Sequence, residues 1–232
     1  MNLPVVLVHG GAFDSSCWDL LRPLMAAPTL AVDLPGRGKR PAPLDSLTLE
    51  ATAEAVLADI NAAGLDDIVL VGHSLAGSTL PGAVALLGDR VRHLVFIAAT
   101  VPEHGLSSLD TLDPEIQKLA AAAPEAAQLP DDLARALFAN DLDDIQFAWM
   151  KARMVPEGMA LTRARVDLSA LRADLTKTWI RTLRDQIVPP ERQLRFATNI
   201  GSSHVVDLDA GHMCMISRAP ELAIMLDGLA NA

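Results

Sequence analysis

The sequence predicts an α/β protein built on a doubly wound, six-stranded parallel sheet. Short runs rich in Val, Leu and Ile alternate with helix-forming stretches, and these runs are apolar on both faces. A parallel sheet is covered by helices on both sides, so its strands carry apolar residues at successive positions. The expected strands are residues 4–8, 30–33, 67–71, 92–98, 177–183 and 204–208.

Helices are expected in the intervals between the first three strands. One is predicted around residues 18–26, and a longer one over residues 48–63. Thr48 is a suitable N-cap for the longer helix, and Glu50 lies near the positive end of its dipole. Gly64 then ends the helix, because glycine readily adopts the conformation that follows a helix C-terminus.

The interval between the fourth and fifth strands departs from this alternation. Residues 101–175 are rich in Ala, Leu and charged residues, and prolines divide them into several short helices. A simple crossover between parallel strands needs far fewer residues. We therefore expect residues 101–175 to form a helical cap, inserted into a core made of residues 1–100 and 176–232.

Length and charge narrow the possible functions. The chain has 232 residues, enough for a single core that buries roughly 70% of the unfolded surface. The net charge of −10, without a basic stripe, argues against a nucleic-acid partner. No apolar run reaches the roughly 18–20 residues that span a bilayer, and the N-terminus resembles a first core strand rather than a signal peptide. We expect a cytoplasmic monomer or homodimer that acts on a small molecule, without a membrane partner.

The cysteines and histidines do not form a metal-binding pattern. Cys17 and Cys214 lie far apart in the sequence, which favours two reduced thiols in a cytoplasmic protein. The sequence has no CxxC motif and no His-rich cluster. We expect neither a metal nor a cofactor.

Residues 67–77 contain the feature most informative about function. A β-branched run meets Gly72, then Ser74 and Ala76 at alternate positions, and an apolar, helix-forming stretch follows. This pattern indicates a nucleophile elbow, a sharp turn that presents a serine between a buried strand and a helix. Ala76 stands where glycine is usual, with Gly77 directly behind it. We predict that Ser74 is a nucleophile.

A serine nucleophile needs a histidine base and an acid that orients the histidine. His212 and Asp185 both follow predicted strands, as Ser74 does, so all three belong to one edge of the parallel sheet. Their order along the chain is serine, aspartate, histidine, as in α/β-hydrolases. Glu103 and Asp209 are weaker candidates for the acid, because a solvated or capping role explains each of them.

Two backbone N–H groups are needed to bind the oxyanion that forms during attack. One is expected from Leu75, which follows the nucleophile. The other is expected from the glycine-rich loop after the first strand, where Gly11 is favoured and Ala12 is the neighbouring alternative. The first and third strands are expected to be adjacent, with the second outside the first, so that a crevice opens between these two loops.

Together these residues resemble the α/β-hydrolase superfamily, and within it the small serine esterases related to plant methylesterases and hydroxynitrile lyases. The resemblance covers nearly the whole chain. Its motifs are Val8-His9-Gly10-Gly11-Ala12-Phe13 with Trp18, Asp33-Leu34-Pro35-Gly36, Val71-Gly72-His73-Ser74-Leu75-Ala76-Gly77, Phe96-Ile97-Ala98-Ala99, Asp185 before Ile187-Val188-Pro189, and Gly211-His212-Met213.

The resemblance implies an α/β-hydrolase fold that lacks the N-terminal antiparallel hairpin of the larger superfamily. The related lyases carry a threonine after the first-strand histidine and a lysine just after the triad acid. Here these places hold Gly10 and the segment 186–188, without a lysine. Cyanohydrin cleavage therefore loses support. Superfamily members that use an aspartate nucleophile are disfavoured by Ser74.

The function expected from the sequence is hydrolysis of small, largely apolar carboxylic esters or lactones through an acyl-enzyme. A C–C bond hydrolase, lyase or cyclase with the same triad is the alternative, and a ligand-binding receptor is a third possibility. The expected pocket residues are Ala12, Trp149, Met150, Met154 and Met213. Apolar residues of the cap can equally serve to pack it onto the sheet, so both roles stay open.

Overall fold

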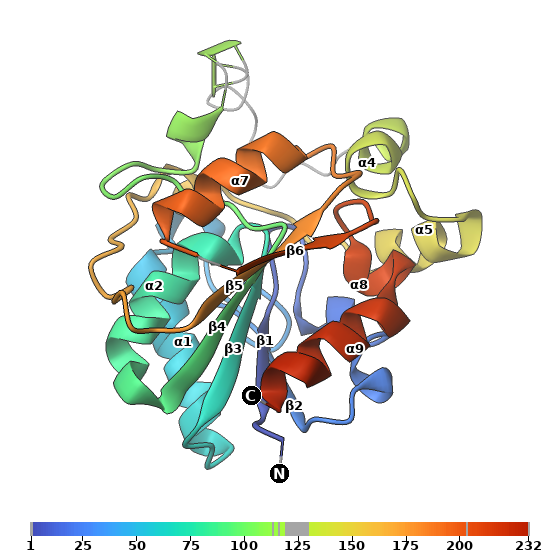
Figure 1. The fold of residues 1–232 in the computed structure, drawn as a ribbon. Coiled ribbons are helices and arrows are strands. Elements are labelled where there is room, and N and C mark those ends of the chain that lie inside the picture. The colour runs from blue at the N-terminus through green and yellow to red at the C-terminus, as the bar shows by residue number, and fades with distance from the viewer. Residues whose placement is uncertain (1, 113, 116, 119–129, 203, 232) are drawn as a thin grey trace.

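A six-stranded, all-parallel sheet forms the centre of the computed structural model, which describes residues 2–112, 114–115, 117–118, 130–202 and 204–231 (Figure 1). The predicted fold class is confirmed. The strands are β1 Val5–Val8, β2 Thr29–Val32, β3 Ile68–His73, β4 Val91–Ile97, β5 Lys177–Thr182 and β6 His204–Leu208. Their order is β2-β1-β3-β4-β5-β6. The first and third strands are therefore adjacent, with the second outside them, as predicted.

Helices cover both faces of this sheet, and alternate strand residues point into two separate cores. On one face, Val6 and Leu70 pack with α1 (Leu49–Ala62), α2 (Ala76–Leu87) and α7 (Pro190–Asn199). On the other face, Leu7 and Val71 pack with α8 (Cys214–Ser217) and α9 (Ala219–Ala230). Figure 1 shows α1 and α2 on one side of the sheet and α8 and α9 on the other. Burial on both faces is the reason why the central strands are continuously apolar.

The α1 helix has the termini that the sequence predicts. The Thr48 side chain accepts a hydrogen bond from Ala51 N at 3.1 Å, which satisfies one backbone donor of the first turn. At the other end Gly64 has a φ of 63°, a left-handed conformation that carries little cost for glycine. Short 3₁₀-helices also precede α1, at η3 Leu44–Ser46, and follow α2, at η4 Gly88–Arg90.

The helix predicted around residues 18–26 is wrong. Two short 3₁₀-helices stand in this region, η1 Ser15–Trp18 and η2 Arg22–Leu24. Pro23 has no N–H with which to continue an α-helix. Asp14 caps η1 by accepting a hydrogen bond from Ser16 N at 2.9 Å. The 3₁₀-helix therefore begins at Ser15, before the start of the predicted helix. The proline therefore limits this interval to short 3₁₀-helices, although the interval connects two parallel strands.

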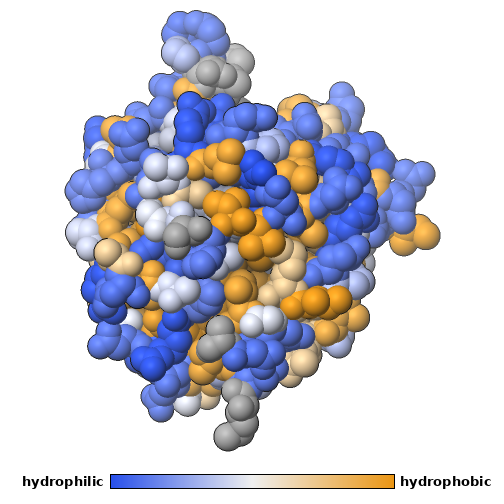
Figure 2. Space-filling model, viewed as in Figure 1, coloured by the Kyte–Doolittle hydropathy of each residue, from blue (hydrophilic) through white to orange (hydrophobic). Residues whose placement is uncertain are grey.

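The expectation of burial on both faces also fails for β6, which is an edge strand. Val205 and Val206 are 39% and 42% exposed. Figure 2 shows apolar surface near the middle of this face of the molecule, in the region of β6. An edge strand has a neighbour on one side only, so its apolar composition does not guarantee burial.

Between β4 and β5 the chain forms short helices at the end of the sheet where the strands terminate (Figure 1). The described elements are η5 Leu109–Thr111, α4 Asp131–Phe138, α5 Asp144–Lys151 and α6 Ala160–Arg163. Residues 113, 116 and 119–129, which belong to the expected cap, lie outside the described residues. Across the described parts of the chain, no helix has the length and apolar character needed to cross a membrane.

Glycines let the elbow between β3 and α2 pack closely. A Cβ on Gly72 would lie 2.6 Å from Leu80 Cδ1, and a Cβ on Gly77 would lie 2.5 Å from the backbone oxygen of Thr100. Ala76, by contrast, places its methyl group in the core and is 1% exposed. The alanine at the usual glycine position is tolerated because Gly77 makes the close backbone approach.

We predict that Gly77→Ala lowers the free energy of unfolding by about 1–3 kcal/mol, because the new methyl group overlaps a backbone carbonyl that cannot rotate away. Urea denaturation measures the change. Gly228→Ala is the matched control: it also adds a methyl group within a helix, but a Cβ there meets nothing within 4 Å. The control should gain about 0.4–1 kcal/mol. Equal stability of the two variants would contradict the packing argument.

Candidate active site

Ser74 lies at the end of β3 in a strained backbone conformation. Its φ of 54° places it in the left-handed region, which costs a non-glycine residue about 1–3 kcal/mol. Three backbone hydrogen bonds hold it there. Ser74 N donates to Ile97 O at 3.1 Å, while Thr100 N and Gly77 N donate to Ser74 O at 2.9 and 3.0 Å. The strand, the following helix and the neighbouring β4 loop thus fix the serine together.

The structure brings Ser74, His212 and Asp185 into one hydrogen-bonded chain. His212 Nε2 lies 3.0 Å from Ser74 Oγ, and His212 Nδ1 lies 2.8 Å from Asp185 Oδ2. The side chains of His212 and Asp185 are fully buried. Each residue follows a different strand, namely β3, β6 and β5, and parallel strands bring the three loops to the same edge. The serine is the member of the chain that faces an open cavity.

Asp185 is held as a carboxylate by its surroundings. Its burial acts to raise the pKa, but His212 and the backbone N–H groups of Val188 and Ile187 outweigh that effect, and the net pKa is lowered. The two N–H groups donate to Oδ1 at 2.9 and 2.8 Å. Thr182 Oγ1 donates to Oδ2 at 3.0 Å. Asp185 therefore presents a negative charge in a fixed orientation to His212.

Gln193 braces the loop that carries Asp185, and the sequence reasoning did not single it out. Its fully buried amide accepts from Thr182 N at 3.1 Å and donates to Val188 O at 2.7 Å and to Thr182 Oγ1 at 2.9 Å. The loop from β5 to α7 is thus tied at both ends. The available sequence signal is weak: positions 193, 196 and 197 share one buried helical face, on which an apolar residue is the ordinary expectation.

His73 holds the backbone of His212, the candidate base, in place. Its Nε2 donates to the backbone oxygen of His212 at 2.9 Å, and the two ring centroids lie 4.6 Å apart. Burial, with His212 nearby, lowers the pKa of His73 to about 3. His73 is therefore neutral at physiological pH. No local pattern in the sequence indicates this contact between His73 and His212.

The backbone N–H groups of Gly11 and Leu75 are free of hydrogen-bond partners among the described residues, and both residues line the cavity at Ser74. The sequence left Gly11 and Ala12 open as the second oxyanion donor. Ala12 N already donates to Glu157 Oε2 at 2.8 Å. The arrangement therefore favours Gly11 over Ala12.

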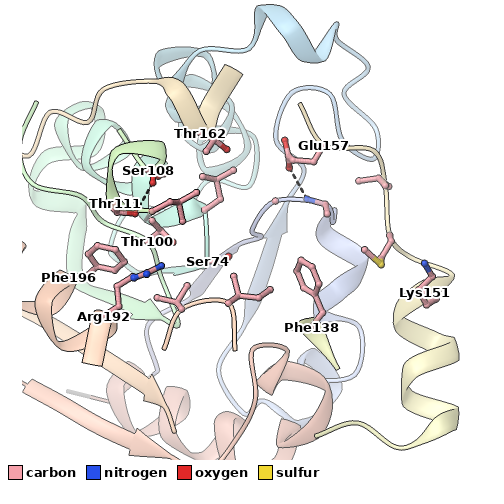
Figure 3. A pocket seen from close by; sticks show the side chains of 18 residues that line it. Ser74, Thr100, Ser108, Thr111, Phe138, Lys151, Glu157, Thr162, Arg192 and Phe196 are labelled. Carbon is pink, nitrogen blue, oxygen red and sulfur yellow. Dashed lines mark hydrogen bonds between the residues drawn. The ribbon is translucent and has the colours of Figure 1, made fainter. Parts of the chain in front are cut away.

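An ion pair from outside the catalytic motifs fixes this loop. Glu157 accepts the Ala12 N–H and pairs with the buried Arg37 guanidinium, and Val155 N donates to Ala12 O at 2.9 Å. In Figure 3 a dashed line at Glu157 marks the hydrogen bond that its carboxylate accepts from the Ala12 N–H. Ala12, with a φ of 62°, is thereby held on both its backbone groups. This clamp joins the loops after β1 and β2 to the segment before α6.

The cavity beside Ser74 has a volume of about 340 Å³, within the usual range for a small ligand. Of the expected pocket residues, Ala12 and Met154 line it. Trp149, Met150 and Met213 do not. Met150 and Met213 are fully buried in the core, and Trp149 packs under the guanidinium of Arg153, 3.7 Å from its ring centroid. Periodicity alone could not show which face of the short cap helices turns toward the serine.

The lining combines apolar and polar side chains (Figure 3). The apolar members are Ala12, Leu75, Leu112, Phe138, Met154, Val155, Ile187, Val188 and Phe196. The polar and charged members are Ser74, Thr100, Ser108, Thr111, Lys151, Glu157, Thr162 and Arg192. The cavity is thus more polar than the sequence suggested.

The two cysteines and the two weaker candidates for the acid take no part in this hydrogen-bonded chain. Cys17 and Cys214 are free and buried, and burial raises the pKa of each thiol, so neither is poised as a thiolate. Asp209 forms an exposed ion pair with Arg184, and Glu103 is exposed on the surface. In the described parts of the chain no group of three or more His, Cys, Asp or Glu side chains could hold a metal ion.

We predict that buried neutral histidines make the fold less stable in mild acid. Burial lowers the pKa of His9 to about 4 and that of His73 to about 3, from an ordinary 6.5. Between about pH 4 and 6.5 the unfolded chain therefore binds protons that the folded chain does not. The free energy of unfolding keeps the whole contribution of these histidines above pH 6.5. Below pH 6.5 it falls, by up to about 1.4 kcal/mol per pH unit for each histidine.

Urea denaturation between pH 7.5 and 5 tests this dependence. His73→Gln should reduce the slope, since its amide can still donate to His212 O but does not titrate in this range. An identical slope in the wild type and His73→Gln would refute the assignment.

We also predict that Arg37 and Glu157 are energetically coupled. Arg37→Met leaves the Glu157 carboxylate half-buried and unpaired, and should lower the free energy of unfolding by about 1–3 kcal/mol. The double variant Arg37→Met/Glu157→Gln should be less destabilised than the sum of the single variants. Chemical denaturation of all four proteins measures the coupling, and strict additivity would show that the pair does not act as a unit.

Several curated proteins are similar to this chain. Methylesterase 3 of Arabidopsis thaliana is 26% identical over 98% of this chain and 95% of its own length. Polyneuridine aldehyde esterase of Rauvolfia serpentina is 26% identical over 94% of this chain and 91% of its own. A carbendazim hydrolyzing esterase of Nocardioides sp. (strain SG-4G) is 34% identical, over 50% of this chain and 51% of that protein.

Solved structures show the same fold. An extracellular alpha/beta-hydrolase from a Paenibacillus species superposes with a TM-score of 0.87 at 22% identity, covering 97% of each chain. Polyneuridine aldehyde esterase superposes with a TM-score of 0.80 at 22% identity, covering 99% of this chain and all of the other. The profile of the alpha/beta hydrolase family matches residues 5–224. The chain therefore belongs to the alpha/beta hydrolase family.

Proposed function

We propose that this protein is a serine esterase that hydrolyses small carboxylic esters or lactones through an acyl-enzyme intermediate. The observation that carries the proposal is the chain of hydrogen bonds from Ser74 through His212 to Asp185, which opens onto a cavity large enough for a small ester. Relatives that align over nearly the whole chain are named methylesterases, which supports ester chemistry.

Each residue has a role that follows from its position. His212 Nε2 takes the proton of Ser74 Oγ as the oxygen attacks the ester carbonyl. The N–H groups of Gly11 and Leu75 then stabilise the negative charge on the carbonyl oxygen. His212 returns its proton to the departing alcohol, and later activates a water that releases the acid from Ser74. Asp185 keeps the imidazole in one orientation and stabilises its positive charge in both steps.

The arrangement around Gly10 supports esterase over lyase chemistry. A Cβ at position 10 would lie 2.7 Å from Ser74 Cβ. The threonine that characterises the related lyases therefore has no room here unless the nucleophile moves. With glycine at this place, the serine keeps direct access to a carbonyl carbon in the cavity.

Ser74→Ala is expected to lower kcat/KM for p-nitrophenyl acetate by at least about 10⁴-fold, because the attacking oxygen is lost. The measurement is release of p-nitrophenol at saturating and subsaturating ester. His104→Gln, which changes an exposed histidine far along the chain from the triad, should leave kcat/KM unchanged. Activity that survives intact in Ser74→Ala would rule out the serine mechanism.

Asp185→Asn should lower kcat by about 10³- to 10⁴-fold with little change in KM, because the amide no longer fixes the imidazole in the required tautomer. Asp209→Asn is the matched control, since Asp209 precedes His212 by three residues but is exposed and pairs with Arg184. Equal activity of the two variants would exclude Asp185 as the orienting acid.

A further inference from the structure

Arg192 lines the cavity at Ser74 with its charge unpaired. It lies in the first turn of α7, and Figure 3 shows its guanidinium pointing into the pocket on the same side as Phe196 and Thr111. Its Nε is buried without a hydrogen-bond partner. Within the described residues its terminal amino groups likewise form neither a hydrogen bond nor an ion pair. Arg192 is partly exposed, but a buried Nε without a partner is unfavourable unless a ligand completes its hydrogen bonds.

The other charged side chains of the cavity are already neutralised. Glu157 pairs with Arg37, and Lys151 Nζ lies 2.9 Å from Asp131 Oδ1. Arg192 is therefore, among the charged lining residues that the structure describes, the one whose charge has no counterion. The Thr100 hydroxyl lines the same cavity and also has no side-chain hydrogen bond to a described residue.

Two carboxylates that share a neighbouring hollow with Arg192 do not neutralise its charge. Glu103 and Asp110 border a neighbouring hollow to which Arg192 also contributes, but neither forms an ion pair with it. Asp110 instead accepts hydrogen bonds from Ser107 N at 2.8 Å and Ser107 Oγ at 2.7 Å. The guanidinium is thus available to a molecule in the cavity.

The backbone beneath Arg192 is firmly placed. Arg192 N donates to Pro189 O at 2.8 Å, and the next residue, Gln193, is bonded to Thr182 and Val188 on either side of Asp185. The same loop that orients Asp185 therefore sets the position of Arg192. A cation built on such a support is suited to a fixed position of charge on a substrate, since a guanidinium binds a carboxylate through paired N–H groups.

We propose that Arg192 forms a carboxylate-binding subsite, and that the preferred substrates are small esters that also carry a carboxylate. The inference rests on the proposed function, because it names the substrate class of the Ser74 site. The ester lies at Ser74 and the oxyanion N–H groups, while the carboxylate meets Arg192. For a monomethyl dicarboxylate, the reaction with one water yields the dicarboxylate, methanol and one proton.

The overall charge of the protein makes such a preference informative. The chain carries a net charge of −10, which repels anions at long range. A preference for anionic esters would therefore reflect a local contact and not general attraction. It would also be retained in moderate salt, because interactions inside the cavity are screened less than those between surface charges.

The test compares kcat/KM for monomethyl succinate, glutarate and adipate with kcat/KM for the matching methyl esters in which an uncharged amide replaces the free carboxylate. Hydrolysis of each ester is followed by the release of a proton. O-acetyl glycolate and its amide place the carboxylate on the alcohol side instead. We expect the wild type to favour the carboxylate in at least one series, and Arg192→Gln to reduce the ratio of carboxylate to amide by about ten- to a hundredfold. Arg192→Lys should retain part of the preference.

Arg195→Gln is the matched control, because Arg195 lies on the same helix and borders the neighbouring hollow but does not line the cavity at Ser74. It should leave the ratio unchanged. If the ratio is the same in the wild type and Arg192→Gln for every ester hydrolysed, the subsite is refuted while the esterase proposal stands.

A binding measurement separates the two proposals if no ester is hydrolysed. Calorimetric titration of glutarate into Ser74→Ala and into Ser74→Ala/Arg192→Gln does not depend on turnover. Binding that weakens at least tenfold in the double variant supports the subsite even if the esterase proposal fails. Equal affinity of the two proteins for glutarate, or no binding to either, overturns the subsite.

Discussion

The close backbone contact at the end of β3 is the constraint on which the rest of the site depends. Ser74 keeps a φ of 54° because hydrogen bonds to Ile97 and from Thr100 tie it to the β4 side of the sheet. The helix that follows approaches so closely that Gly77 has no room for a side chain. The stability of the whole sheet thus offsets a local strain that places one oxygen in a cavity.

Buried polar side chains transmit that rigidity to the other members of the site. Gln193 ties the Asp185 loop to the end of β5, His73 holds the backbone of His212, and Glu157 with Arg37 holds Ala12 beside the oxyanion N–H groups. Burying such groups is costly unless each finds partners. Because they do, three separate loops behave as one preorganised unit, which is what electrostatic stabilisation of a transition state requires.

Most charged side chains at the cavity have an oppositely charged partner among the described residues, and Arg192 does not. Asp185 lies behind His212, with its Oδ2 at 2.8 Å from His212 Nδ1, and Glu157 is paired with Arg37. Arg192 alone among the described lining residues keeps a charge without a counterion in the cavity. Ser74 and the unpaired Arg192 thus line the same small cavity.

The sequence by itself determined the parallel sheet, the relative places of its first three strands and the three residues brought together at its edge. These depend on local signals: apolar runs, the Thr48 cap, Gly64 and the elbow around Ser74, with the geometry of parallel strands fixing the shared edge. Pro23 was also a local signal, and giving it more weight would have prevented the wrong helix around residues 18–26. Only the tertiary structure revealed Gln193, the Glu157 clamp and the unpaired Arg192. These roles arise from contacts between distant segments, such as Ala12 with Glu157, 145 residues apart, and no local pattern encodes such contacts.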